Sequence, residues 1–281
     1  MLVATQMLLS TGCGESKATG RVIHKNDRKS LTTEPVESGT GDSKGTHIRG
    51  EPTKQHQVLG LFGGYLSCSS NQDAPLDGTR MVRFLNLINA QQETNGAVPG
   101  HFVSCFGVDP SVVNFMTSDE PNKVRKLPVQ QFIQEFQGMI RRTEQPEVHI
   151  VGHSYGGWLS LQIANSIRSE NPLSSLTTID PISHLLCTPP DVINSLVGNP
   201  VKPACNQAPA DLPDEDLAQI AERAKTWINF YQTDANLLHS GSLNGAENVK
   251  LNFPAAPIDP HTHIADDQLV ISKVLERIIG N

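Results

Sequence analysis

The sequence contains no run of 18 or more apolar residues, about the length that a membrane-spanning helix requires. It also has no cluster of Lys and Arg with interleaved aromatic residues, and aromatic residues make up only 5% of the chain. Residues 1–56 hold eight Lys and Arg against six Asp and Glu, whereas residues 57–281 hold 14 against 23. An acidic surface repels phosphate backbones, so we predict that this protein does not bind nucleic acid.

The cysteines do not have the Cys-x-x-Cys spacing or any other spacing typical of zinc sites. Apart from Cys13 there are four, an even number that favours disulfides in an exported protein. Cys68 and Cys105 follow or end adjacent predicted strands, and Cys187 and Cys205 bracket a Pro-rich segment. We therefore predict the pairs 68–105 and 187–205, with free thiols in a cytosolic protein as the alternative.

The N-terminal region predicts export. Residues 1–13 are apolar and end in Ser10-Thr11-Gly12-Cys13, which resembles the end of a bacterial lipoprotein signal, with Cys13 as the lipidated residue. Residues 14–56 are rich in Gly, Ser, Thr, Lys and Glu and predict a disordered tether before a folded domain at 57–281. The expected location is the periplasm or cell envelope, with membrane anchoring through Cys13. Secretion as a soluble protein, or an apolar N-terminus with a free cysteine, is the alternative.

Strand and helix patterns alternate along residues 57–281. Apolar runs predict strands at 56–62, 102–106, 148–151, 173–179, 227–231 and 249–251. Apolar residues at helical spacing predict helices at 81–88, 129–140, 158–167, 217–224 and 271–278. This alternation predicts an α/β fold with a parallel sheet of about six strands and helices on both faces. The Pro-rich segment at about 182–213 predicts a small cap.

The pentapeptide Gly152-His153-Ser154-Tyr155-Gly156 is the most informative motif. It follows an apolar run at 148–151 and precedes an apolar helix pattern, the order expected for a serine on a sharp turn between strand and helix. Such a turn brings the flanking positions so close that both must be glycine. A second copy of the pattern, around Ser43, has no apolar run before it, so we interpret it as linker.

A serine nucleophile requires a histidine base and a carboxylate that orients the base. Asp180 directly follows a predicted strand, where its carboxylate would emerge beside Ser154, and Asp234 follows the next strand as the alternative. His261 and His263 lie before the closing helix. Because alternate positions of an extended segment face opposite ways, only one of the two can face Ser154. We expect His153 to be structural, because its side chain on the turn points away from Ser154.

These residues resemble those of the α/β-hydrolase superfamily, and within it the lipase and esterase branch. The elbow motif, the segment Thr178-Ile179-Asp180-Pro181 and a His near the closing helix carry this resemblance, in the catalytic order Ser, Asp, His. It implies Asp180 as the acid by analogy with pancreatic-type lipases, Asp234 by analogy with most other members, and His261 rather than His263 as the base. The tether offers no equivalents of the superfamily's first two strands, hence a sheet of about six.

The resemblance also implies an oxyanion hole built from backbone N–H groups. One would come from Tyr155, after the nucleophile, and the other from the loop Gly63-Gly64-Tyr65, with Tyr65 as donor. The implied activity is hydrolysis of a small-molecule or lipid ester through an acyl-enzyme on Ser154. Amide or thioester hydrolysis uses the same groups and remains open, as does a catalytically silent binding protein with this fold.

We predict that the protein uses neither a metal nor a cofactor. The segment Asp259-Pro260-His261-Thr262-His263 places two histidines near a carboxylate, but no third cluster or Cys ligand set accompanies it. Glycine spacings typical of dinucleotide-binding and phosphate-binding loops do not occur.

Overall fold

The computed structural model describes residues 57–65, 67–68, 76, 79–92, 100–107, 109–167, 173–183, 210–234, 238–253 and 259–280. The chain divides into residues 1–50 and residues 51–281, and every described residue belongs to the second unit. The predicted export signal with Cys13, the tether, Cys187, Cys205 and residues 184–209 of the predicted cap lie outside the described residues.

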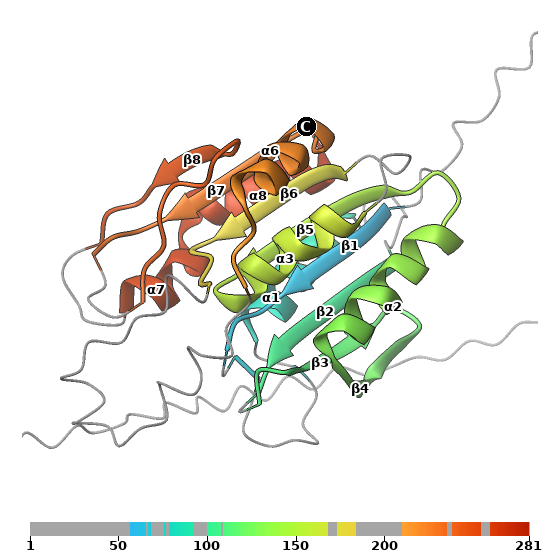
Figure 1. Cartoon of the computed structure of the whole chain (residues 1–281). Helices are drawn as coiled ribbons and strands as arrows, with labels where there is room; N and C mark the ends of the chain where they lie inside the picture. Colours follow the sequence, from blue (N-terminus) through green and yellow to red (C-terminus); the bar gives the residue numbers. More distant parts are fainter. Residues whose placement is uncertain are drawn as a thin grey trace, which may run out of the picture. The chain divides into compact units, whose positions relative to one another are not determined.

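The described residues form one sheet in the order β4-β3-β2-β1-β5-β6-β7-β8. Its strands are β1 (Gln57–Phe62), β2 (Gly100–Phe106), β3 (Val112–Thr117), β4 (Glu120–Pro128), β5 (Glu147–His153), β6 (Leu173–Ile179), β7 (Trp227–Tyr231) and β8 (Glu247–Lys250). Six neighbouring strands are parallel, as the alternation of patterns predicted: β2, β1, β5, β6, β7 and β8. Figure 1 shows them running side by side between helices.

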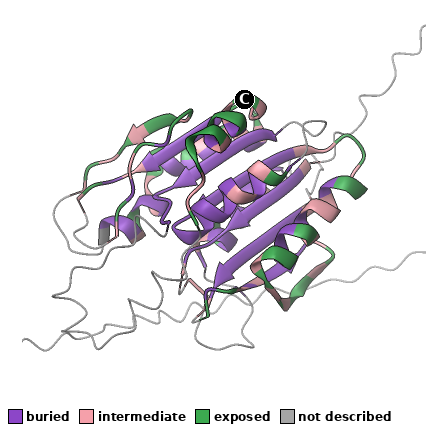
Figure 2. Cartoon of the chain, in the orientation of Figure 1, coloured by how far each residue is buried: buried purple, intermediate pink, exposed green. Residues whose placement is uncertain are grey.

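The sheet has eight described strands rather than about six, because an antiparallel hairpin, β3 and β4, extends it beyond β2. The prediction missed β4 because it is an edge strand with mostly exposed or half-exposed side chains (Figure 2), and it overlooked the apolar, mostly buried residues of β3. An edge strand of this kind has many charged residues and no apolar run, which protects it from pairing with other chains. The positions beyond β2 are thus occupied by a segment that follows β2 in the sequence.

Helices cover both faces of the sheet, as predicted. On one face, α1 (Arg80–Gln92) and α8 (Gln268–Ile279) pack with Leu59, Val103 and Val151. On the other, α2 (Val129–Arg142), α3 (Tyr155–Ser166) and α6 (Asp214–Arg223) share a core with Phe62 and Val148. Each helix turns its apolar stripe toward the sheet, and burial of this surface is the main force holding the layers together. No helix among the described residues has the length and apolar character needed to cross a membrane.

The carboxyl ends of the central strands set the position of the site. In the register of β5 with β6, His153 lies beside Ile179, so Ser154 and Asp180 leave neighbouring strands at the same level. The N–H of Ser154 donates to the Ile179 carbonyl at 3.0 Å, and the N–H of Asp180 donates to the Phe230 carbonyl at 2.7 Å. Parallel strands therefore present both side chains at one edge of the sheet.

Candidate active site

Ser154 lies on a strained turn between β5 and α3, with φ 59° and ψ −126°. A Cβ at Gly152 would overlap the carbonyl group of Gly156 and the hydroxyl of Ser160, and a Cβ at Gly156 would overlap the carbonyl of Phe62. Glycine is therefore required at both positions, as the motif predicted. Because the turn is fixed by these close approaches, the Ser154 side chain is held at the sheet edge.

The structure brings together Ser154, His261 and Asp180. The His261 Nε2 lies 3.0 Å from the Ser154 Oγ, and its Nδ1 lies 2.7 Å from the Asp180 Oδ2. A carboxylate only accepts hydrogen bonds, so Nδ1 carries the proton and the neutral Nε2 accepts from the serine hydroxyl. Ser154 is 6% exposed, His261 4% and Asp180 0%. This geometry lets the imidazole take the serine proton while the carboxylate fixes its tautomer.

Asp180 is held by three further donors and has a left-handed φ of 42°. Its Oδ1 accepts from the N–H of Ser240 at 2.9 Å and from the Ser240 hydroxyl at 2.6 Å. Its Oδ2 accepts from the Gln232 Nε2 at 2.7 Å besides His261. Burial alone would raise the pKa of Asp180, but the contact with His261 and the hydrogen bonds from Ser240 and Gln232 outweigh burial and lower it. The carboxylate is therefore charged at neutral pH.

Asp234, the alternative acid, has a different set of partners. Its Oδ2 accepts from the N–H of Phe253 at 2.6 Å, and its own N–H donates to the Gln232 Oε1 at 2.9 Å. The bond from Phe253 connects the segment after β7 with the segment after β8, and the bond to Gln232 lies within the segment after β7. The Asp234 side chain thus stabilises a loop, whereas the Asp180 side chain contacts His261.

His261 lies in a short helix, α7 (Asp259–His263), rather than in the extended segment that we expected. Pro260 at the second position suits the first turn of a helix, where its missing N–H is not needed. Residues two apart on a helix point about 200° apart, so the helix still separates the two histidines. His261 is buried against Ser154, and His263 is exposed. Within the described part of the chain, no group of three or more His, Cys, Asp and Glu side chains could hold a metal ion.

The loop after β1 lies directly against the nucleophile. A Cβ on Gly64 would be 2.5 Å from the Ser154 Cβ and 2.9 Å from its Oγ. The loop is tied to β2, because the N–H of Gly63 donates to the Ser104 carbonyl and the N–H of Phe106 donates to the Gly64 carbonyl. The structure therefore brings the segment that contains Tyr65 to Ser154.

Tyr65 and Tyr155, the two residues with the predicted oxyanion-hole N–H groups, are in contact through their rings. The centroids are 5.5 Å apart and the rings are inclined by 29°. Burial, and next the neighbouring Tyr65, raise the pKa of the Tyr155 phenol above its ordinary value. Its hydroxyl is therefore neutral at neutral pH.

Cys68 and Cys105 form a disulfide, as predicted. The bridge joins the segment after Tyr65 to the end of β2, and the N–H of Cys68 also donates to the Phe106 carbonyl at 3.4 Å. Cys105 is fully buried. The loop beside the nucleophile is thus fixed on both sides of Tyr65. The second predicted pair, Cys187 with Cys205, lies outside the described residues and stays a prediction.

The sequence did not predict three contacts that hold Asp180 and His261 in place. Gln232 and Ser240 bind Asp180, and the Nε2–H of His153 donates to the His261 carbonyl at 2.8 Å. A Ser or Gln in a loop carries no sequence signal for such contacts. The position of His153 beside Ser154 was such a signal, but its partner, the carbonyl of His261, lies 108 residues away.

Comparisons of the whole chain match no protein-family model and no curated protein. Among solved structures, the chain is similar to the ydeN gene product from B. subtilis, with 11% identity, coverage of 79% of this chain and 98% of that one, and a TM-score of 0.43. It is also similar to an alpha/beta hydrolase superfamily protein from Enterococcus faecalis (10% identity, 79% and 89% coverage, TM-score 0.42). A lipase-esterase related protein from Clostridium acetobutylicum is a third (11% identity, 80% and 96% coverage, TM-score 0.42). The chemistry of the site is argued from its side chains.

Proposed function

We propose that this protein is a serine hydrolase that cleaves carboxylic esters through an acyl-enzyme on Ser154. The observation that carries the proposal is the continuous hydrogen-bonded chain from the Ser154 Oγ through His261 to Asp180. A buried carboxylate, an imidazole and a serine in this order form the arrangement that activates a hydroxyl group at neutral pH. The strained backbone of Ser154 supports the same role, because strained residues concentrate at functional sites.

In the acylation step, the Ser154 Oγ attacks the ester carbonyl carbon while the His261 Nε2 takes the hydroxyl proton. The imidazolium that forms is stabilised by Asp180, which stays ionised. The tetrahedral intermediate collapses, the bond to the alkoxy oxygen breaks, and the imidazolium gives its proton to the leaving alcohol. Water then repeats the sequence on the acyl-enzyme, with His261 as base, and releases the carboxylic acid and free Ser154.

The negative oxygen of the tetrahedral intermediate requires hydrogen-bond donors. We assign this role to the backbone N–H groups of Tyr65 and Tyr155, which come from the loop after β1 and from the first turn of α3. The close approach of Gly64 to Ser154 supports this assignment. The positive end of the α3 dipole favours an anion at the same point. Loss of one such donor typically lowers kcat by about 10²- to 10³-fold.

Amides and thioesters can be cleaved by the same groups, and the ester class is proposed because the elbow motif and the Asp180-Pro181 step resemble those of the lipase and esterase branch. We further propose that the protein acts outside the cytoplasm, anchored through Cys13 or secreted. The Cys68–Cys105 disulfide supports an oxidising compartment.

The test uses p-nitrophenyl esters of increasing acyl length with the wild type and with Ser154→Ala. We expect a burst of p-nitrophenol from the wild type, a dependence of kcat/KM on acyl length, and loss of activity in the variant. A fluorophosphonate should label Ser154 and should not label Ser43, which serves as an internal control. Unchanged hydrolysis and labelling in Ser154→Ala would contradict the proposal, and a wild type that only binds esters would favour a silent binding protein.

A further inference from the structure

His153 is a buried histidine that the proposed mechanism does not use. It is the last residue of β5 and is 5% exposed. Its Nε2 lies 2.8 Å from the peptide carbonyl oxygen of His261, and the two imidazole rings stack with centroids 5.0 Å apart and planes inclined by 29°. Because a carbonyl oxygen can only accept, the Nε2 of His153 carries the proton and donates it to this bond.

The segment that carries His261 needs such a contact. Helix α7 has only five residues, and a helix of this length has no stability of its own. The orientation of α7 relative to Ser154 therefore depends on its contacts with the rest of the fold. An error of about 1 Å in the position of a catalytic group can lower a rate by about 10²-fold.

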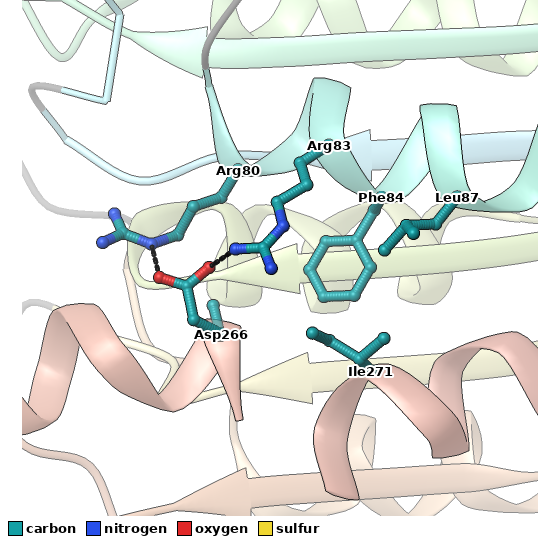
Figure 3. Close-up of a pocket in the computed structure, with 7 residues that line it drawn as sticks. Arg80, Arg83, Phe84, Leu87, Asp266 and Ile271 are labelled. Atoms are coloured by element: carbon teal, nitrogen blue, oxygen red, sulfur yellow. Dashed lines mark hydrogen bonds and ion pairs between the residues drawn. The ribbon is translucent and has the colours of Figure 1, made fainter. Parts of the chain in front are cut away.

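Another attachment of this segment lies at the surface. Asp266, in η1 (Ile264–Asp266) directly after α7, accepts from the Arg80 Nε at 3.2 Å and from the Arg83 Nη1 at 2.8 Å. Figure 3 shows both guanidinium groups reaching this one carboxylate from α1. The side chains of Arg80 and Arg83 are 36% and 56% exposed, and ion pairs of this kind contribute little. The buried contact of His153 is thus stronger than these ion pairs, and it acts together with the His261–Asp180 hydrogen bond and the burial of Ile264 and Ala265.

We propose that His153 is a positioning residue, whose N–H fixes the backbone of α7 at His261 and whose ring supports the plane of the His261 imidazole. This inference rests on the serine hydrolase function proposed above. In it, His153 never exchanges a proton with substrate. It keeps the Nε2 of His261 directed at Ser154 while the imidazole accepts and returns the serine proton.

The charge state of His153 suits this role. Burial, and next the charge of the neighbouring His261, lower the pKa of His153 to about 3. The ring is therefore neutral at the pH where an esterase of this type works, and it adds no second positive charge beside the His261 imidazolium. A Lys or Arg at this position would oppose the charged intermediate.

The experiment separates the hydrogen bond from the size of the side chain. His153→Gln keeps an N–H donor near the position of Nε2, whereas His153→Met has a similar length without a donor, and His153→Phe keeps a flat ring without a donor. His149→Phe is the matched control, because His149 is also buried on β5 and makes one side-chain hydrogen bond, 2.8 Å to Ser175. It lies four residues earlier on the strand, about 13 Å away.

We measure kcat and KM with a p-nitrophenyl ester and count active sites by the amplitude of the burst. Per active site, kcat should fall about 10- to 100-fold in His153→Phe and His153→Met, with KM changed by less than about threefold. In His153→Gln and in His149→Phe, kcat should stay within about fivefold of the wild type. The Met variant gives the donor-free result if the Phe variant fails to fold.

Three results would overturn the inference: wild-type kcat in the donor-free variants, a loss in His153→Gln as large as in His153→Met, or a loss in His149→Phe as large as in His153→Phe. An inactive wild type is a separate outcome, because it removes the proposed function itself. An active wild type with unaffected donor-free variants removes only the role of His153.

Discussion

Ser240 donates two hydrogen bonds to a single oxygen of Asp180, one from its peptide N–H and one from its hydroxyl. Both bonds go to Oδ1, so Oδ2 is left to His261 and Gln232. Charge-assisted hydrogen bonds are about twice as strong as neutral ones. The two oxygens therefore have different roles. Oδ1 anchors the carboxylate to the loop after β7, and Oδ2 orients the imidazole of His261.

Asp180→Asn should lower kcat by about 10⁴-fold, because an amide cannot hold the His261 tautomer or stabilise its charged form. Asp234→Asn is the control, and it should lower kcat less than about tenfold, since Asp234 binds the Phe253 N–H rather than the base. Steady-state hydrolysis of a p-nitrophenyl ester measures both. The opposite ranking would assign the acid to Asp234.

Gly64→Ala should remove most of the activity, because the new methyl group would meet the Ser154 Cβ and Oγ at 2.5 and 2.9 Å. The loop or the nucleophile must then shift, and we expect labelling by a fluorophosphonate to slow by about 10²-fold. Gly241→Ala, in a position with no atoms within 4 Å of the added Cβ, should label at the wild-type rate. Equal rates for the two variants would exclude a role for the loop at the nucleophile.

Reduction of the Cys68–Cys105 bridge should destabilise the protein by roughly 2 to 4 kcal/mol, because the bridge closes a loop with a sequence separation of 37. It should also lower kcat, since the bridge fixes the segment after Tyr65. Urea unfolding and ester hydrolysis of Cys68→Ser test this, and peptide mass spectrometry without reduction tests both pairs, 68–105 and 187–205. Finding all four thiols open to alkylation in exported protein would refute the pairing.

Acid should destabilise the fold through two buried histidines. Burial, and next Lys225, lower the pKa of His149 to about 4, and burial lowers that of His153 to about 3, both from 6.5. The unfolded chain then binds more protons than the fold below pH 6.5, so stability is full above this pH and falls toward pH 4 and 3. His149→Phe should reduce this loss by on the order of 3 kcal/mol. Urea unfolding at pH 7 and pH 4 measures the difference, and an unchanged difference would contradict the assignment.

The sequence predicts the centre of this fold well because local patterns determine it. Apolar runs that end in Gly or Asp mark β5 and β6, and the elbow glycines follow from steric contact between neighbouring turns. β4 was missed because exposed charged residues hide its strand pattern, whereas the apolar residues of β3 were overlooked. The short helix α7 was missed because five residues are too few for a periodic signal.

The candidate site was predictable where residues act from the ends of central strands. Ser154 and Asp180 follow adjacent strands, and His261 precedes the closing helix. The residues that hold these three were not predictable, because Gln232 and Ser240 reach Asp180 across 52 and 60 residues of sequence. Such contacts arise from how loops meet above the sheet, and no periodicity or motif encodes them.

The left-handed backbone of Ser154 also bears on how this protein would respond to selection. A non-glycine residue in such a conformation costs about 1 to 3 kcal/mol, which glycine would largely recover. Ser154→Gly should therefore unfold at a higher urea concentration than the wild type while it loses its nucleophile. A library of variants screened only for thermal stability would favour this change. Folding stability and catalytic activity thus place opposite demands on residue 154.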